Sequence, residues 1–130
     1  MAQARYLAVT IPNGTAVSAG FSLMMGEQIV AIETPAAWTA ADVAVQVSRD
    51  GTNFVNLFDS AGAANANAVA KVTTGAGELH FLGTVGASGG IMLYAVVGPL
   101  VFRLQSQTVG ALTTVNQGAD RICQVLITRF

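Results

Sequence analysis

The sequence predicts an all-β protein, an antiparallel β-sandwich of about eight to nine short strands. Apolar and polar residues alternate over short segments along much of the chain, which is the period of a strand with one buried face. Glycine, asparagine and proline separate these segments, and no ten-residue window shows a helical apolar stripe flanked by caps. Because we find no linker and no internal repeat in 130 residues, we expect one domain, residues 1–130.

The first two expected strands end at proline-containing turns. Residues 5–11 (RYLAVTI) precede a Pro-Asn-Gly sequence, and residues 28–34 (QIVAIET) precede Pro35. Proline cannot donate a backbone hydrogen bond to a sheet and therefore marks both ends. Residues 36–41 are the one stretch in which we expect a short helical turn, with Thr39 near its start.

Residues 42–48 and 53–58 predict a β-hairpin, the clearest local feature of the chain. In the first strand the side chains of Val43, Val45 and Val47 share one face, and those of Ala44, Gln46 and Ser48 share the other. Asp50-Gly51 between the strands is typical of a type I′ turn, because both central residues of that turn need positive φ. We expect one buried face on this hairpin.

Five further segments continue the strand pattern between loops of small residues. They are residues 68–73, 78–82, 91–97, 100–105 and 121–129. The last segment holds Cys123, the only cysteine, which we expect to be a small core residue. A single cysteine excludes an internal disulfide and any multi-cysteine metal site.

The composition is unusually apolar and poor in charge. Apolar residues make up 52% of the chain and charged residues 10%, against about 25% charged in an average soluble domain. The longest apolar run, residues 91–102, is interrupted by Gly98-Pro99 and is shorter than the roughly 20 residues of a membrane-spanning helix. We therefore expect no membrane partner, and the N-terminal residues predict no secretory signal.

Two explanations of this apolar composition remain open. Much of it is alanine and glycine in loops, which raises the mean hydropathy without creating exposed apolar patches. Alternatively, apolar surface is covered by neighbouring copies or by a larger particle, and we favour this explanation. The six basic residues are scattered among seven acidic ones, so no basic stripe forms and we expect no nucleic-acid partner.

The reactive side chains predict no catalytic centre and no cofactor. His80, the only histidine, follows Glu78 on the same face of a short strand, which favours a solvated surface pair over a general base. A serine nucleophile would need a base and an oxyanion hole, which one histidine without a recognisable motif does not supply. The glycine-rich residues 83–90 lack the lysine and the following helix of a phosphate-binding loop. We expect a protein that is not an enzyme; a small hydrolase would require His80.

Two binding sites stay open at this stage. Asp50, Asn53 and Asp59 are close in sequence and could bind a calcium ion, although a hairpin would hold the two aspartates at different ends. We therefore expect no metal site. Trp38 is the candidate platform for a glycan, because sugars stack on exposed aromatic side chains. The alternative is that this indole closes one end of the sandwich core, and we favour it.

Two segments resemble small bacteriophage virion proteins. PAAWTAADVAVQVSRDGTNFVNLFDSAG is similar to a tryptophan-to-hairpin motif of these proteins, and VNQGADRICQVLITRF resembles their closing strand. Together they cover about a third of the chain, in the expected order. Residues 81–102 depart from the pattern, because the middle of the relatives is shorter.

The resemblance implies a jelly-roll-like subunit on the surface of a phage particle, most specifically a capsid decoration (cement) subunit. Its partners would be other copies of itself and phage capsid or tail proteins. We expect the contact surfaces in residues 1–6 and 81–102. The alternatives are a carbohydrate-binding module that attaches a virion or an enzyme to a cell surface, and a tail or head-fibre attachment protein.

Overall fold

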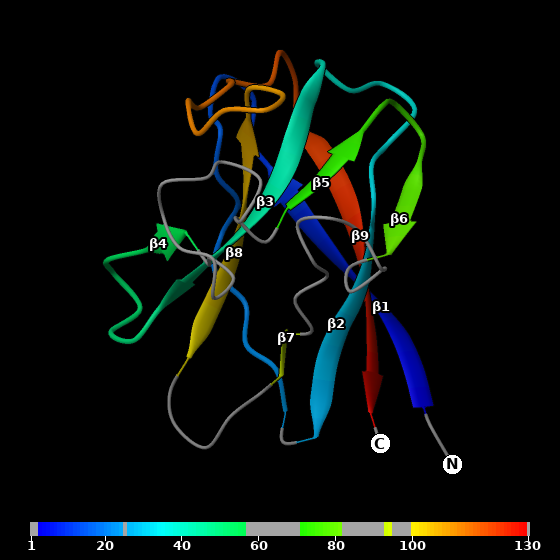
Figure 1. Ribbon diagram of the computed structural model, residues 1–130, viewed down its shortest axis with the longest axis vertical. Coiled ribbons are helices and arrows are strands. Elements are labelled where there is room, and N and C mark those ends of the chain that lie inside the picture. Colours follow the sequence, from blue (N-terminus) through cyan, green and yellow to red (C-terminus); the bar gives the residue numbers. More distant parts are fainter. Residues whose placement is uncertain (1–2, 25, 57–70, 82–92, 95–99, 130) are drawn as a thin grey trace.

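The computed structural model is an all-β structure, with nine strands in the residues that it describes (Figure 1). It describes residues 3–24, 26–56, 71–81, 93–94 and 100–129, and no helix is present in these ranges. The strands are β1 (Gln3–Ile11), β2 (Glu27–Glu33), β3 (Ala41–Ser48), β4 (Val55–Asn56), β5 (Lys71–Thr74), β6 (Leu79–Phe81), β7 (Leu93–Tyr94), β8 (Val101–Gln107) and β9 (Arg121–Arg129). The predicted antiparallel β-sandwich is confirmed.

The strands form two antiparallel sheets. Sheet A has the order β1-β9-β2, and the short strands β6 and β7 both pair with β2, one beside each half of it. Sheet B places β3 between β8 on one side and the short strands β4 and β5 on the other. The turn between β5 and β6 carries the chain from one sheet to the other (Figure 1).

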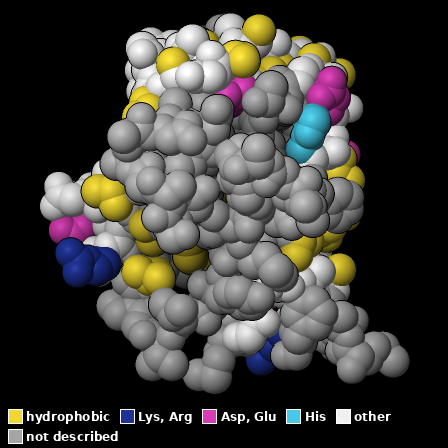
Figure 2. Space-filling model, viewed as in Figure 1, with side chains coloured by type: hydrophobic (Ala, Val, Ile, Leu, Met, Phe, Trp, Pro, Cys, Tyr) yellow, Lys and Arg dark blue, Asp and Glu magenta, His cyan; other side chains and the backbone are white. Residues whose placement is uncertain are grey.

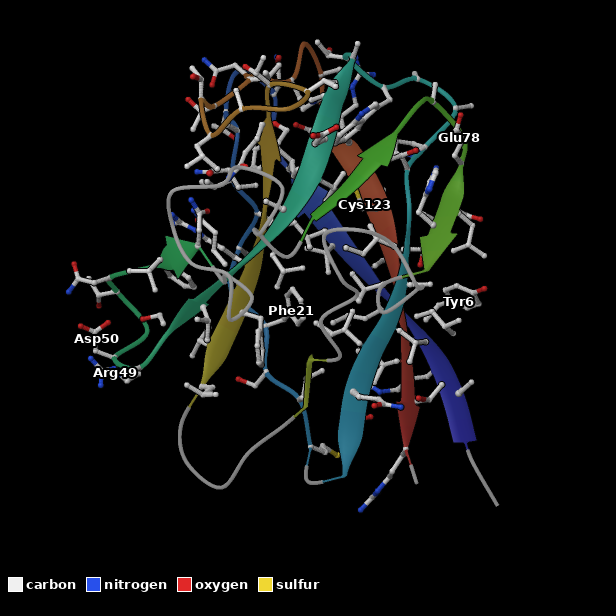
Figure 3. All side chains as sticks on the ribbon, in the orientation of Figure 1. Tyr6, Phe21, Arg49, Asp50, Glu78 and Cys123 are labelled. Carbon is white, nitrogen blue, oxygen red and sulfur yellow. The ribbon has the colours of Figure 1, made fainter. Side chains whose placement is uncertain are left out.

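The core lies between the inner faces of the two sheets. Its buried members are Val9, Ile11, Ile29, Ile32, Val43, Val45, Phe102, Leu104, Cys123, Val125 and Ile127. Val43 and Val45 are fully buried and Val47 packs against the core cluster, as the alternation predicts. Cys123 is a buried core residue, as expected (Figure 3), and burial raises the pKa of its thiol to about 12.

The chain covers the outer edge of β8 with its own irregular segment, residues 15–21. Phe21 and Phe102 exchange backbone hydrogen bonds of 2.7 and 2.8 Å, and the Ser18 amide donates to the carbonyl of Leu104 at 2.9 Å. The Ser18 hydroxyl accepts the Leu104 amide at 2.9 Å. These bonds satisfy backbone groups that an open edge would expose.

The expected type I′ turn at Asp50-Gly51 is wrong, although the hairpin itself is confirmed. Gly51 has φ +80°, but no described residue other than glycine has positive φ, so Asp50 cannot take the first I′ position. Strands β3 and β4 first pair at Val47 and Val55, which leaves a wider loop. The Asp50 carboxylate holds this loop by accepting the amides of Thr52 and Asn53, both at 2.8 Å.

The helical turn expected over residues 36–41 is also wrong. This stretch makes bends, and Ala41 already begins β3. Backbone groups of this stretch bond to a residue far away in the sequence. The Gln117 side chain accepts the Thr39 amide at 3.0 Å and donates to the Thr39 carbonyl at 3.2 Å. A tertiary contact therefore overrides the local preference.

Several expectations fall outside the described residues. Parts of the strands expected at 53–58, 68–73, 78–82 and 91–97 do so, as do the glycine-rich residues 83–90 and most of the contact surface expected over residues 81–102. Residues 1 and 2 of the other expected contact surface lie outside them as well.

We predict that Leu104→Ala lowers the free energy of unfolding by about 2–5 kcal/mol, because it leaves a cavity where a fully buried side chain packs between the sheets. Urea denaturation measures this loss. The control is Val55→Ala on β4, which is 62% exposed and should change stability by less than about 0.5 kcal/mol. Equal losses in the two variants would contradict the assigned core.

We further predict that Cys123 does not react with a thiol reagent in the folded protein near neutral pH, because the thiolate is the reactive form and burial disfavours it. Absorbance after addition of a disulfide reagent measures the free thiol. Full reaction is expected in denaturant. Rapid labelling under native conditions would show that the thiol is not held between the sheets.

Candidate functional site

The outer face of β1 and β9 carries no charged side chain at four successive outward positions on each strand. We call this surface the β1–β9 face. Its four cross-strand pairs are Ala4 with Thr128, Tyr6 with Leu126, Ala8 with Gln124 and Thr10 with Ile122. The alternate residues of both strands supply core side chains, which places these eight on the opposite face. Tyr6 is 55% exposed and Ile122 51% exposed.

Sheet A extends this face toward β2 and β6. Glu33 of β2 pairs with Gln124 on one side and with Leu79 of β6 on the other. Leu79 is 38% exposed. Glu33 brings a charge to this extension, so the uncharged β1–β9 face is the part that can bury area against another protein without desolvating an ion.

Arg5 is the charged residue on the inner side of β1, and it forms an ion pair within the chain. Arg5 donates to Glu27 through Nε at 2.8 Å and Nη2 at 3.0 Å, while Glu27 is buried and also accepts the Met24 amide at 2.7 Å. The Arg5 hydrogen bond lowers the pKa of Glu27 against the opposing effect of burial, and the same bond raises the pKa of Arg5. This bidentate pair joins β1 to β2 across β9.

The outer face of sheet B differs from the expectation that β3 has one buried face. Gln46, Gln105 and Gln107 on this outer face are all buried, as are Ala44 and Ser48. One glutamine on β3 and two alternate glutamines on β8 are also typical of a solvated strand face, so sequence reasoning missed this cluster. An outward glutamine gives the same sequence pattern whether it is solvated or covered, so the sequence carried no signal for this cluster.

These buried amides bond mainly to one another. The Gln46 side-chain amide donates to Asn56 at 3.0 Å and to Gln105 at 3.1 Å, and Gln107 donates to the same two oxygens at 3.0 and 2.9 Å. Arg103 donates to the Gln46 oxygen at 2.7 Å and lies 4.2 Å from the centre of the Phe54 ring. Burial lowers the pKa of Arg103. The cluster joins β3, β4 and β8 and thereby fixes their register.

His80 and Glu78 form the surface pair that the sequence predicts. His80 Nε2 and Glu78 Oε2 are 2.6 Å apart, and both side chains are more than a third exposed. The hydrogen bond from His80 lowers the pKa of Glu78, helped by the Gly75 amide. Figure 2 shows the imidazole (cyan) beside acidic side chains (magenta) at the upper right of the view. The pair stabilises the turn between β5 and β6.

Trp38 packs against the core cluster at the end of the sandwich. Its ring is half-buried, and its Nε1 donates to the carbonyl of Ala41 at 3.2 Å. This placement matches the favoured alternative, in which the indole closes the core, and leaves less of the ring for stacking on a sugar.

The carboxylate of Asp50 is occupied by its own loop. Besides the two backbone amides, it accepts the Ser48 hydroxyl and the Asn53 side-chain amide, each at 2.8 Å, and these bonds lower its pKa. Asp50 and Arg49 lie at the tip of the hairpin (Figure 3). Asp59 lies outside the described residues. Within the part of the chain that the structure describes, no three His, Cys, Asp or Glu side chains could hold a metal ion together.

Comparison with known proteins gives no relative: no family model matches the chain, and neither a curated protein nor a solved structure matches it. No helix of the described residues is long and apolar enough to cross a membrane.

We predict that Glu27→Gln lowers the free energy of unfolding by about 1.5–3 kcal/mol near neutral pH, because it removes hydrogen bonds between charged groups. The pKa of Glu27 in the folded protein lies below its ordinary value of 4.5. The stabilisation is therefore complete above that value and is lost as the pH falls through the folded pKa. Denaturation of both proteins over a range of pH measures it.

The difference between wild type and Glu27→Gln should shrink as the pH falls below 4.5. A difference that stays constant at every pH would contradict the assigned ion pair.

Proposed function

We propose that this protein is a non-enzymatic structural subunit of a bacteriophage particle, most specifically a capsid decoration subunit. The observation that carries the proposal is the exposed and uncharged β1–β9 face. Catalysis needs reactive groups that converge on a substrate. In the described residues the conspicuous polar groups instead bond to one another, as in the amide cluster and the Asp50 loop.

Burial of this face against the particle is the proposed mechanism. Removing apolar surface from water contributes roughly 25 cal/mol per Å². Side chains such as Tyr6 and Ile122 become buried without desolvating an ion. Because copies bound side by side reinforce one another, contacts of modest strength add up to tight attachment.

The resemblance to phage virion proteins supports the same function. Its first segment, residues 35–62, contains β3 and β4, and its second, residues 115–130, contains all of β9. Of these strands, β3 and β9 are central in their sheets, so the resemblance covers part of the scaffold that holds the β1–β9 face in place.

The expected location is the outer shell of the particle, with copies of the same protein and capsid proteins as partners. Quantitative mass spectrometry of purified particles tests this location. We expect a copy number comparable to that of the shell subunits. A handful of copies per particle would move the protein to the tail or a fibre, and its absence from particles would contradict the proposal.

Reattachment of the recombinant protein to particles that lack it tests the face itself. We predict that Ile122→Lys weakens binding at least tenfold, because each contact would then have to desolvate a charge on the β1–β9 face. Val55→Lys is the matched control, since Val55 is also an exposed β-branched residue, 62% exposed against 51% for Ile122, but lies on sheet B. Equal binding of the two variants would exclude this face.

A glycan array provides the contrasting result. Specific glycan binding by the wild type that is lost in a folded Trp38→Ala variant would favour the attachment module over the architectural subunit. We expect no such binding, because the indole packs on the core.

A further inference from the structure

The outer edge of β1 is the one long sheet edge in the described structure that nothing covers. Residues 15–21 cover β8. The opposite edge of each sheet is made of strands of two to four residues, and short edge strands resist pairing with other chains. By contrast β1 has nine residues, and among the described residues its only strand partner is β9. Figure 1 shows its N-terminal end at the margin of the molecule.

Strand β1 lacks most of the features that protect natural edges. It contains no lysine and no proline, and it pairs with β9 through nine consecutive residues without a bulge. Its only charged residue, Arg5, lies on the inner side of the strand, the one protective feature present, and it is engaged by Glu27 of the same chain. In an antiparallel edge strand, alternate residues direct their backbone N–H and C=O groups away from the sheet. These groups of β1 can accept another strand.

We propose that β1 pairs antiparallel with β1 of a second copy, about a two-fold axis beside Tyr6. This inference rests on the proposed architectural function, because that function requires contacts between copies of the protein. The register places Tyr6 opposite Tyr6 and Ala4 opposite Ala8 of the other copy. Opposed aromatic side chains stabilise strand pairs, whereas an axis at Arg5 would place two arginines directly opposite each other. The pairing ends before Pro12, which cannot continue it.

A second copy fits this edge because a two-fold axis uses the same strand twice. The antiparallel arrangement needs no other sequence, and it brings together two strands whose outward side chains are uncharged. Sheet A of one copy would continue into sheet A of the other. The two β1–β9 faces would then form one surface of twice the width, which gives each dimer two attachments to a particle.

Sedimentation velocity of the purified full chain over a range of concentrations tests the pairing. We expect a reversible dimer whose dissociation constant rises at least tenfold in Tyr6→Lys, because two lysines would face each other at the axis. Ile122→Lys is the matched control, since it adds the same charge to the same face one strand away from the edge, and it should change the constant less than threefold. A monomer at all concentrations, or an equal effect of the two variants, would overturn the proposal.

A disulfide tests the register independently of the affinity. Directly opposed residues of antiparallel strands have Cα atoms about 4.5–5.5 Å apart, within the range of a disulfide. Tyr6→Cys should therefore form a covalent dimer on mild oxidation, while the buried Cys123 does not compete. Under the same oxidation, Ile122→Cys should form a covalent dimer more slowly than Tyr6→Cys does. A dimer that crosslinks equally through both positions would overturn the register.

The proposed function and the proposed pairing can be contradicted independently of each other. A dimer in solution made by a protein that is absent from particles would retain the pairing and contradict the virion function. Particles that carry the protein in abundance, with a strictly monomeric protein in solution, would retain the function and contradict the pairing.

Discussion

The position of β9 between β1 and β2 determines which side chains this protein presents. Cys123, Val125 and Ile127 are fully buried against sheet B, and this packing forces Ile122 and Leu126 to the other side of the strand. A shift of one residue would exchange the two sets and expose the core. The ion pair of Arg5 with Glu27 fixes the same arrangement at one end, because it joins the strands on both sides of β9. The uncharged surface is thus a direct consequence of the core.

Much of the polar chemistry of the described chain is used to hold its own loops and strands. Asp50 organises the hairpin loop, Glu78 with His80 holds the turn between the sheets, and the glutamines of β3 and β8 bond to one another. A side chain whose hydrogen bonds are already made gains less by binding a ligand. In the residues that the structure describes, these polar groups support the fold, as the proposed architectural function requires.

The strands and their inner faces could be predicted from the sequence because alternation is a local signal. Val43 and Val45 face the core as their spacing predicts, and the segment from Arg121 to Arg129 forms one strand with Cys123 inside. The type I′ turn was wrong because Asp50 forms side-chain bonds that stabilise a longer loop. The burial of Gln107 could not be predicted, since a glutamine at an outward position gives the same pattern whether it is solvated or covered. The uncovered edge of β1 depends on which strands become neighbours, which one sequence does not specify.

Hydrogen–deuterium exchange of the protein on particles, compared with the dilute free protein, tests the central claim that it acts by contact through β1 and β9. Backbone amides of β1 should exchange more slowly on the particle, while those of the exposed hairpin loop, residues 49–54, should exchange at the same rate in both samples. Unchanged exchange along β1, or protection confined to the hairpin loop, would contradict the account.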